Sequence, residues 1–284
     1  MKWVNVRWSE RTRAGLIQGD NVHLADAEDV MHLLGDLDAA ATAALQSDPV
    51  ALNEVQIVQP ILNPRKILGI GLNYAEHAKE SVSFITNSAP SVQKWFNKQA
   101  TAANGPYEDV HLPVVSEQLD YEAEIVAIIG KTGRHVPKER AWELIAGLCC
   151  GCDFSVRDWQ RASQTMIMGK GFDTHAPFGP MLVTPDEIED FEAVEVRGYV
   201  NSELRQSGHA RDMTFSIAEQ IAHLTAAFTL EPGDVIFTGT PAGVGAGFDP
   251  PKWLRAGDRV RIEVSGLGHM EHEIVAEKQV TVLR

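Results

Sequence analysis

The stretch LDYEAEIVAIIG, residues 119–130, predicts a buried strand and carries an unusual group of charges. Its second half is apolar and β-branched, as in strands that lie inside a core. Its first half contains Asp120, Glu122 and Glu124, and alternate side chains of an extended chain point to the same side. The three carboxylates therefore share one face. A solvent-exposed face, pairing with Lys or Arg, and a bound cation all explain such a group.

The composition is that of a globular protein, with 284 residues, 44% hydrophobic and 23% charged. Lys+Arg number 25 and Asp+Glu 39, and the formal net charge of −14 argues against sequence-independent binding of nucleic acid, which needs a basic surface. No apolar run approaches the ~18 residues of a membrane span. The stretch MKWVNVRWSERTRAG, residues 1–15, lacks the apolar region of a signal peptide. We expect a cytoplasmic protein that binds neither membranes nor nucleic acid.

Short strand-like segments dominate, and two units are expected. Residues 1–60 form a small N-terminal domain, and Pro60 and Pro64 mark the entry into a second domain, residues 61–284. Helical patterns cover residues 25–48, 137–150 and 214–228. Strands and helices do not alternate regularly, so a doubly wound parallel sheet is not expected. The predicted fold class is α+β and β-rich.

Three glycine-containing stretches were candidates for ligand loops. GIGLNY, residues 69–74, lacks the last glycine of a dinucleotide fingerprint, and GKT, residues 130–132, lacks the first glycine of a Walker A loop. TGTPAGVG, residues 238–245, follows a strand, and its backbone can approach a ligand closely. A plain turn explains that stretch equally well.

A further carboxylate, Asp153, follows the small-residue run CCGC, residues 149–152. Together with Glu122 and Glu124 it offers three hard oxygen ligands, which suit Mg²⁺ or Mn²⁺, with Ca²⁺ as a further candidate. Zinc prefers nitrogen and sulfur ligands. The cysteines at 149, 150 and 152 lie too close together for one tetrahedral site, and we expect them to be small core residues.

Five segments together resemble the fumarylacetoacetate hydrolase family, from about residue 62 to the C-terminus. They are GLNYAEHAKE (71–80), DYEAEIVAIIG (120–130), GCDFSVRDWQ (151–160), GKGFDTHAPFGP (169–180) and TLEPGDVIFTGTPAGVG (229–245). The resemblance implies a mixed β-sandwich roll, a variable N-terminal domain and a homodimer. It also implies that Glu122, Glu124 and Asp153 hold the divalent cation.

The substrate expected for such a site is a small 2-oxo acid. Its 1-carboxylate and 2-oxo oxygens chelate a cation, which then stabilises an enolate as a Lewis acid. Hydrolysis, decarboxylation, hydration and isomerisation all use such an enolate, so the cation ligands alone do not determine which reaction is catalysed. The resemblance implies a catalytic His77–Glu80 dyad on a lid that orders over substrate. From the residues alone, a surface His–Glu pair three positions apart on a helix is the alternative.

The resemblance assigns four further residues to the site. Lys170 is the catalytic cation for the developing negative charge, Arg157 and Gln160 orient substrate oxygens, and Thr240 contacts the substrate carboxylate. An exposed position is the alternative for Lys170, Arg157 and Gln160. Asp120 is not counted as a ligand, because it can cap the strand entry or pair with a basic residue.

Residues 81–97 depart from the family pattern. Phe84, Ile85, Trp95 and Phe96 in this segment suggest an apolar wall and a substrate tail with carbon bulk. The leading functional prediction is a metal-dependent hydrolase that cleaves a C–C bond in an acylpyruvate or other 2,4-dioxo acid. Decarboxylation of an oxaloacetate-like acid, isomerisation or hydration of a 2-oxo-enoic acid, and a non-catalytic binding protein are the alternatives.

Overall fold

The computed structural model describes residues 1–81 and 91–283 of the chain, and in these ranges strands contain more residues than helices do. The strands are β1 Lys2–Trp8, β2 Arg11–Gln18, β3 Asn21–Leu24, β4 Pro49–Ala51, β5 Gln56–Val58, β6 Ile67–Gly71, β7 Lys94–Lys98, β8 Ala103–Asn104, β9 Val110–Leu112, β10 Leu119–Asp120, β11 Ala123–Ile129, β12 Ile145–Cys152, β13 Ser155–Val156, β14 Ala176–Val183, β15 Glu195–Val200, β16 Glu203–His209, β17 Val235–Phe237, β18 Arg259–Val264 and β19 Gly268–Ala276.

Short helices connect these strands. The α-helices are α1 Leu37–Ala44, α2 Ala75–Ser81, α3 Arg157–Ala162, α4 Ile167–Lys170 and α5 Ile217–Ala227. The 3₁₀ helices are η1 Val30–Leu33, η2 Leu52–Glu54, η3 Ala100–Ala102, η4 Lys138–Leu144, η5 Pro185–Glu187, η6 Phe191–Ala193, η7 Ala210–Asp212 and η8 Gly245–Gly247. Within the described ranges, no helix has the length and apolar character needed to cross a membrane.

Two sheets pack face to face around the core. The larger, of 12 strands, runs β4-β3-β2-β1-β14-β12-β11-β17-β6-β7, with β5 beside β1 and β8 beside β14. It is mixed, because β11 is antiparallel to β12 and β17 whereas β17 is parallel to β6. The second sheet runs β16-β15-β18-β19-β9. The expected β-rich class and mixed sandwich are confirmed.

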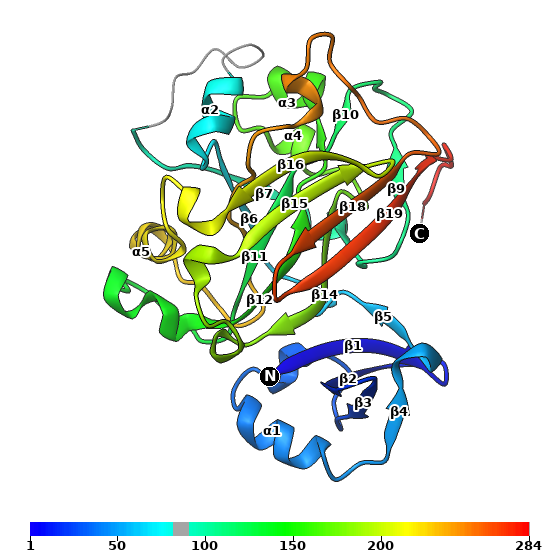
Figure 1. Cartoon of the computed structure of the whole chain (residues 1–284), viewed down its shortest axis with the longest axis vertical. Coiled ribbons are helices and arrows are strands. Elements are labelled where there is room, and N and C mark those ends of the chain that lie inside the picture. The colour runs from blue at the N-terminus through cyan, green and yellow to red at the C-terminus, as the bar shows by residue number, and fades with distance from the viewer. Residues whose placement is uncertain (82–90, 284) are drawn as a thin grey trace.

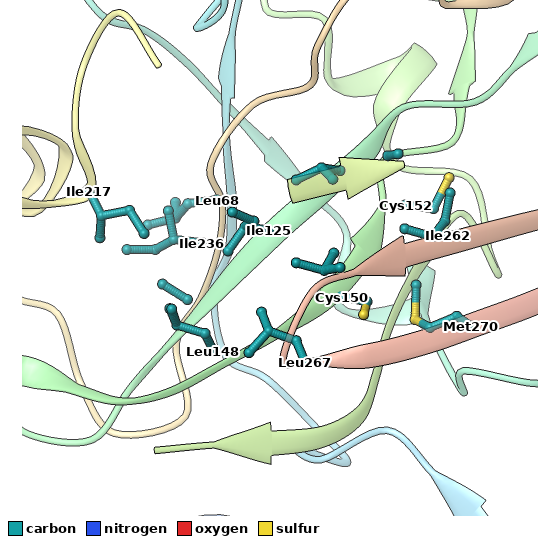
Figure 2. Close-up of a cluster of buried hydrophobic side chains, with 14 of the residues drawn as sticks. Leu68, Ile125, Leu148, Cys150, Cys152, Ile217, Ile236, Ile262, Leu267 and Met270 are labelled. Atoms are coloured by element: carbon teal, nitrogen blue, oxygen red, sulfur yellow. The ribbon is translucent and has the colours of Figure 1, made fainter. Parts of the chain in front are cut away.

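The main apolar cluster fills the space between the sheets. Figure 2 shows Ile125 of β11 and Cys150 of β12 in the larger sheet, and Ile262 of β18 and Met270 of β19 in the second. All four are fully buried. The three cysteines are buried and form no disulfide, as expected for core residues.

The N-terminal strands β1–β4 and helix α1 lie at one end of the molecule, and α2, α3 and α4 lie at the other (Figure 1). Strand β1 joins the larger sheet by pairing with β14, with Lys2 opposite Val183 and Trp3 opposite Leu182. The domain boundary near residue 60 stays a prediction. The helical pattern at residues 25–48 produces only η1 and α1.

One expected helix is largely wrong. Residues 137–150 were expected to be helical, but η4 ends at Leu144 and the chain continues as strand β12. Every residue of β12 is buried, because the strand lies between β11 and β14 in the sheet. A strand buried on both faces has a continuous apolar run, which periodicity alone does not distinguish from a buried helix. The helix expected at residues 214–228 does form, as α5 with Ser216 and Glu219 in a capping box.

Candidate active site

Antiparallel pairing of β11 and β12 brings the three candidate cation ligands together. Ala123 pairs with Cys152 in this ladder, and the N–H of Asp153 donates to the carbonyl of Glu122 at 2.9 Å. One oxygen each of Glu122, Glu124 and Asp153 lie within 4.8 Å of one another, and all three residues are buried. The register of the two strands thus places Asp153 beside Glu122 and Glu124, which precede it by 31 and 29 positions in the sequence.

Two buried lysines neutralise part of this cluster. The Nζ atom of Lys170 lies 2.7 Å from Oε2 of Glu122 and 2.6 Å from Oδ2 of Asp153. Lys98 donates to the other Asp153 oxygen, Oδ1, and to the carbonyl of Phe154 at 3.1 Å. The sequence reasoning missed Lys98. Its signal is KWFNK, residues 94–98, where alternation places Lys98 on the same strand face as Phe96.

Arg157 joins the cluster to Asp120. Its Nε lies 2.8 Å from Oδ2 of Asp120, and its Nη1 lies 2.7 Å from Oε1 of Glu122 and 2.9 Å from Oε1 of Gln160. Asp120 thus pairs with a basic residue, one of the two roles considered for it. Arg157 and Gln160 are buried, not exposed on a loop.

The cluster retains one excess negative charge. Asp120, Glu122, Glu124 and Asp153 contribute −4, and Lys98, Lys170 and Arg157 contribute +3, which leaves −1. Burial raises the pKa of Glu122, but the charges of Lys170 and Arg157 outweigh it and hold that pKa below its usual range.

Glu124 is the carboxylate of this cluster that has no cationic partner among the described residues. Burial, followed by the charges of Asp153 and Glu122, raises the pKa of Glu124 well above its usual value. It accepts the N–H of Gly239 at 2.7 Å but forms no ion pair with any residue of the described ranges. Three buried carboxylates with residual negative charge fit a hard divalent cation such as Mg²⁺ or Mn²⁺.

The loop after β17, residues 238–247, holds carboxylates with its backbone. The loop turns sharply at Gly243, whose φ of +106° is a backbone conformation that residues with L side chains rarely adopt. The N–H groups of the loop bind three carboxylates: Gly239 donates to Glu124 at 2.7 Å, Gly243 to Glu80 at 3.0 Å, and Gly245 to Asp120 at 2.7 Å. The loop is therefore more than a plain turn, because it fixes the acidic groups of the site.

His77 and Glu80 lie on helix α2 and contact each other. Nδ1 of His77 lies 3.1 Å from Oε2 of Glu80, and the two side chains are 5% and 16% exposed. The pair is therefore not on a solvated surface. The loop holds Glu80, and Glu80 in turn holds Nδ1 of His77, which fixes the orientation of the ring.

A single cavity of about 540 Å³ contains most of the expected site residues. It is lined by Ile70, Gly71, Leu72, His77, Lys94, Phe96, Glu122, Arg157, Gln160, Arg161, Ser163, Gln164, Met166, Lys170 and Thr240. The hydroxyl of Thr240 donates to the carbonyl of Ala123 at 2.8 Å, which fixes it next to the cluster.

The expected apolar wall is partly formed. Phe96 lines the cavity, and its ring lies 4.7 Å below the amine of Lys170. For Trp95 the expectation is wrong, because this side chain is on the opposite face of β7 and packs against the main core. Phe84 and Ile85 lie outside the described residues.

Comparisons with known proteins identify the family of this chain. Residues 66–275 match the family model for the fumarylacetoacetate (FAA) hydrolase C-terminal domain. Oxaloacetate tautomerase YisK of Bacillus subtilis is 42% identical over 227 residues, which cover 79% of this chain and 74% of the Bacillus protein.

Two solved structures share the fold along nearly the whole chain. The fumarylacetoacetate hydrolase of Exiguobacterium antarcticum has a TM-score of 0.85 at 32% identity, covering 98% of this chain and 100% of that one. The maleylpyruvate hydrolase of Sphingobium sp. SYK-6, solved with manganese(II) and pyruvate, has a TM-score of 0.81 at 30% identity with the same coverage. This chain belongs to the fumarylacetoacetate hydrolase family.

Proposed function

We propose that this protein catalyses the keto–enol tautomerisation of a 2-oxo acid, with a divalent cation in the Glu122, Glu124 and Asp153 cluster. The observation that carries the proposal is the shared cavity, in which His77 faces the same space as Glu122, Arg157 and Lys170. A proton-transfer group, a cation site and fixed positive charges are what enolisation requires. The similarity to an oxaloacetate tautomerase supports this choice among the reactions that share an enolate.

A cation held by the cluster supplies Lewis-acid polarisation of the 2-oxo group. The chain itself supplies the proton transfer. The ring nitrogen of His77 that does not face Glu80 takes a proton from C3, which leaves an enolate, and the imidazolium then gives that proton to the 2-oxygen to complete the enol. In the reverse direction His77 takes the proton from the enol oxygen and delivers it to C3. The carboxylate of Glu80 at Nδ1 stabilises the imidazolium that forms in between.

The remaining polar residues orient the substrate. Lys170 and Arg157 place positive charge beside the oxygen that becomes negative, and both are buried, where such charges act strongly. Gln160 and Thr240 line the cavity and can hold carboxylate oxygens. Because these side chains are fixed by existing hydrogen bonds, little reorganisation is needed during the reaction.

Hydrolysis of a C–C bond in an acylpyruvate, the leading expectation from the sequence, is the second candidate. The specific observation in its favour is the His77–Glu80 pair, since an imidazole backed by a carboxylate also deprotonates water. The similarity to a maleylpyruvate hydrolase supports it as well. Water would attack the distal carbonyl, and the pyruvate enolate would leave.

Product analysis with Mn²⁺ separates the reactions. A tautomerase accelerates the decay of enol-oxaloacetate absorbance while the total oxaloacetate stays constant. A decarboxylase lowers total oxaloacetate and releases carbon dioxide and pyruvate. A hydrolase converts acetylpyruvate to acetate and pyruvate. Decay of the enol at the rate of the protein-free control would reject the proposed function.

We further propose a cytoplasmic homodimer that uses Mg²⁺ or Mn²⁺. Met168, Val280 and Val282 are 55%, 70% and 66% exposed and line one surface hollow of about 1090 Å³, which supports association through this face. Light scattering after size exclusion measures the mass. A mass near the 31.1 kDa of one chain would reject the dimer.

A further inference from the structure

Asp120, the last residue of strand β10, is a buried carboxylate that has no part in the reaction described above. Its side chain is fully buried, and it is not among the residues that line the cavity. Burying a charge costs free energy unless partners compensate for it. Asp120 has partners in two separate parts of the active site, namely helix α3 and the loop after β17. Strand β10 and helices α2 and α3 lie at the same end of the molecule (Figure 1).

The first partner of Asp120 is Arg157, the first residue of α3. Oδ2 of Asp120 accepts the Nε–H group of Arg157 at 2.8 Å. A guanidinium is planar and presents its N–H groups in a fixed fork, so a bond at Nε determines where the other N–H groups point. In this orientation Nη1 lies 2.7 Å from Oε1 of Glu122 and 2.9 Å from Oε1 of Gln160. Asp120 therefore sets the orientation of a cation that lines the cavity.

The second partner of Asp120 is the loop after β17. Oδ1 accepts the N–H of Gly245 at 2.7 Å, and Oδ2 accepts the N–H of Ala246 at 3.0 Å. This contact requires a glycine, because a Cβ atom at position 245 would lie 2.6 Å from Oδ1 of Asp120. The position of the loop therefore depends on the carboxylate of Asp120.

The loop connects Asp120 to the His77–Glu80 pair. The N–H of Gly243 donates to Glu80 at 3.0 Å, and Glu80 lies 3.1 Å from Nδ1 of His77. The carbonyl of Gly243 accepts the hydroxyl of Tyr121, the residue that follows Asp120, at 3.0 Å. Gly243 is thus bound to β10 and the segment after it on one side and to helix α2 on the other. A displacement of the loop would change the position of Glu80.

We propose that Asp120 is a positioning residue that aligns Arg157 with the His77–Glu80 pair. The inference rests on the proposed function, in which Arg157 places charge beside the reacting oxygen and His77 moves the proton. It adds to that function a residue that acts on both groups without touching the substrate. Misplacement of a reacting group by 1 Å can cost about 10²-fold in rate, so this alignment is expected to matter.

Asp120→Asn tests the inference. The carboxylate accepts four N–H groups, of Tyr121, Arg157, Gly245 and Ala246, whereas an amide of the same shape turns a donor toward some of them. In the enol-oxaloacetate assay with Mn²⁺ we expect kcat to fall about 10²-fold. In titration calorimetry of the Mn²⁺-loaded protein we expect about tenfold weaker binding of oxalate, because the orientation of Arg157 is lost.

Gly245→Ala is a second variant that changes no charge. Its Cβ atom pushes the loop away from Asp120 and leaves the Asp120–Arg157 pair in place, so no buried cation loses its partner. We expect kcat to fall at least about tenfold, whereas KM and the affinity for oxalate change less than about threefold. A role of Asp120 in folding alone does not produce this separation of kcat from KM.

A double-mutant cycle tests the connection to Glu80. If Asp120 acts in part through Glu80, the two substitutions are not independent. The loss of kcat in the double variant Asp120→Asn, Glu80→Gln should be smaller, by about threefold or more, than the product of the two single losses.

Asp234→Asn is the matched control. Asp234 is also a fully buried carboxylate, and its Oδ2 lies 2.7 Å from Nζ of Lys66 and accepts the N–H of Glu231 at 2.8 Å. This variant should lose stability but keep the wild-type kcat and the wild-type affinity for oxalate.

The inference is overturned if Asp120→Asn and Gly245→Ala lose no more kcat than Asp234→Asn does, or if the single losses in the double-mutant cycle multiply. Catalysis by the wild type together with either of these results leaves the proposed function in place. If the wild type does not accelerate the decay of the enol, the proposed function fails, and the affinity for oxalate decides on Asp120. An affinity that falls in Asp120→Asn but not in Asp234→Asn then supports the inference, and equal affinities overturn it.

Discussion

The amine of Lys170 lies 2.6 Å from Oδ2 of Asp153, one of the three candidate cation ligands. The same amine lies 2.7 Å from Oε2 of Glu122, a second candidate ligand. Lys170 thus pairs with two of the three carboxylates that are candidates to hold a divalent cation. In this arrangement Lys170 both stabilises the carboxylates when no cation is bound and opposes the positive charge of a bound cation.

Substitution of Lys170 by Met should therefore lower the stability of the metal-free protein and raise its affinity for a divalent cation. Without the ammonium group, the buried carboxylates lose a partner, and the metal-free protein should be destabilised by about 3 kcal/mol. Mn²⁺ should bind more tightly, so its addition should raise the melting temperature more than in the wild type. Calorimetry and thermal unfolding measure both effects, with the exposed Lys138→Met as control. Weaker Mn²⁺ binding in K170M would contradict this account.

Glu124→Gln should have the opposite effect on the metal-free protein. Glu124 has no cationic partner among the described residues, and burial with Asp153 and Glu122 nearby raises its pKa. A neutral amide still accepts the N–H of Gly239, so the metal-free variant should gain about 1–3 kcal/mol. The Mn²⁺-induced rise in melting temperature should disappear. A retained Mn²⁺ shift would remove Glu124 from the cation site.

His77→Ala should abolish proton transfer without affecting the cation site. Loss of a positioned base lowers kcat about 10²–10⁴-fold. The Mn²⁺-induced rise in melting temperature should stay as in the wild type, because His77 is not one of the clustered oxygens. Glu80→Gln, which keeps the shape but removes the charge next to Nδ1, should lose less activity. The exposed His223→Ala is the control, and full activity of H77A would reject the role of the pair.

The sequence predicted the carboxylate cluster because strand alternation is a local property. Glu122 and Glu124 are two positions apart, so any extended conformation places them together. Asp153 was predicted to be a cation ligand from the family resemblance and from its position after a small-residue run. Its contact with Glu122 depends on the β11–β12 register, which local pattern does not supply.

Two features of the site could not be predicted from pattern. Alternation places Lys98 on the same face as Phe96, but it does not show that this face is buried, and the burial of Lys98 follows from its contact with the segment after β12. The three carboxylate contacts of the loop after β17 are made by backbone N–H groups. Every residue except proline has such a group, so the residue types of the loop do not reveal these contacts. The error at residues 137–150 has a related cause, since strand β12 is buried on both faces and shows no alternation.

Two buried histidines outside the active site predict acid sensitivity of the fold. Burial lowers the pKa of His175 to about 3 and that of His272 to about 4. Each ring has one nitrogen at a backbone carbonyl, of His111 and Glu108 respectively, and a second nitrogen buried without a hydrogen-bond partner in the described structure. Protonation therefore requires a charge inside the core.

The sign of the effect follows from proton linkage. An unfolded histidine has a pKa near ~6.5, so between that pH and the lower folded pKa the unfolded state binds more protons. The free energy of unfolding should thus fall as pH drops below about 6.5, by about 2 kcal/mol per histidine at pH 5. His272→Gln removes one titration, so denaturant unfolding should show the stability difference from wild type shrinking by about 2 kcal/mol between pH 7.5 and pH 5. A difference that is constant with pH would show that His272 does not titrate on unfolding.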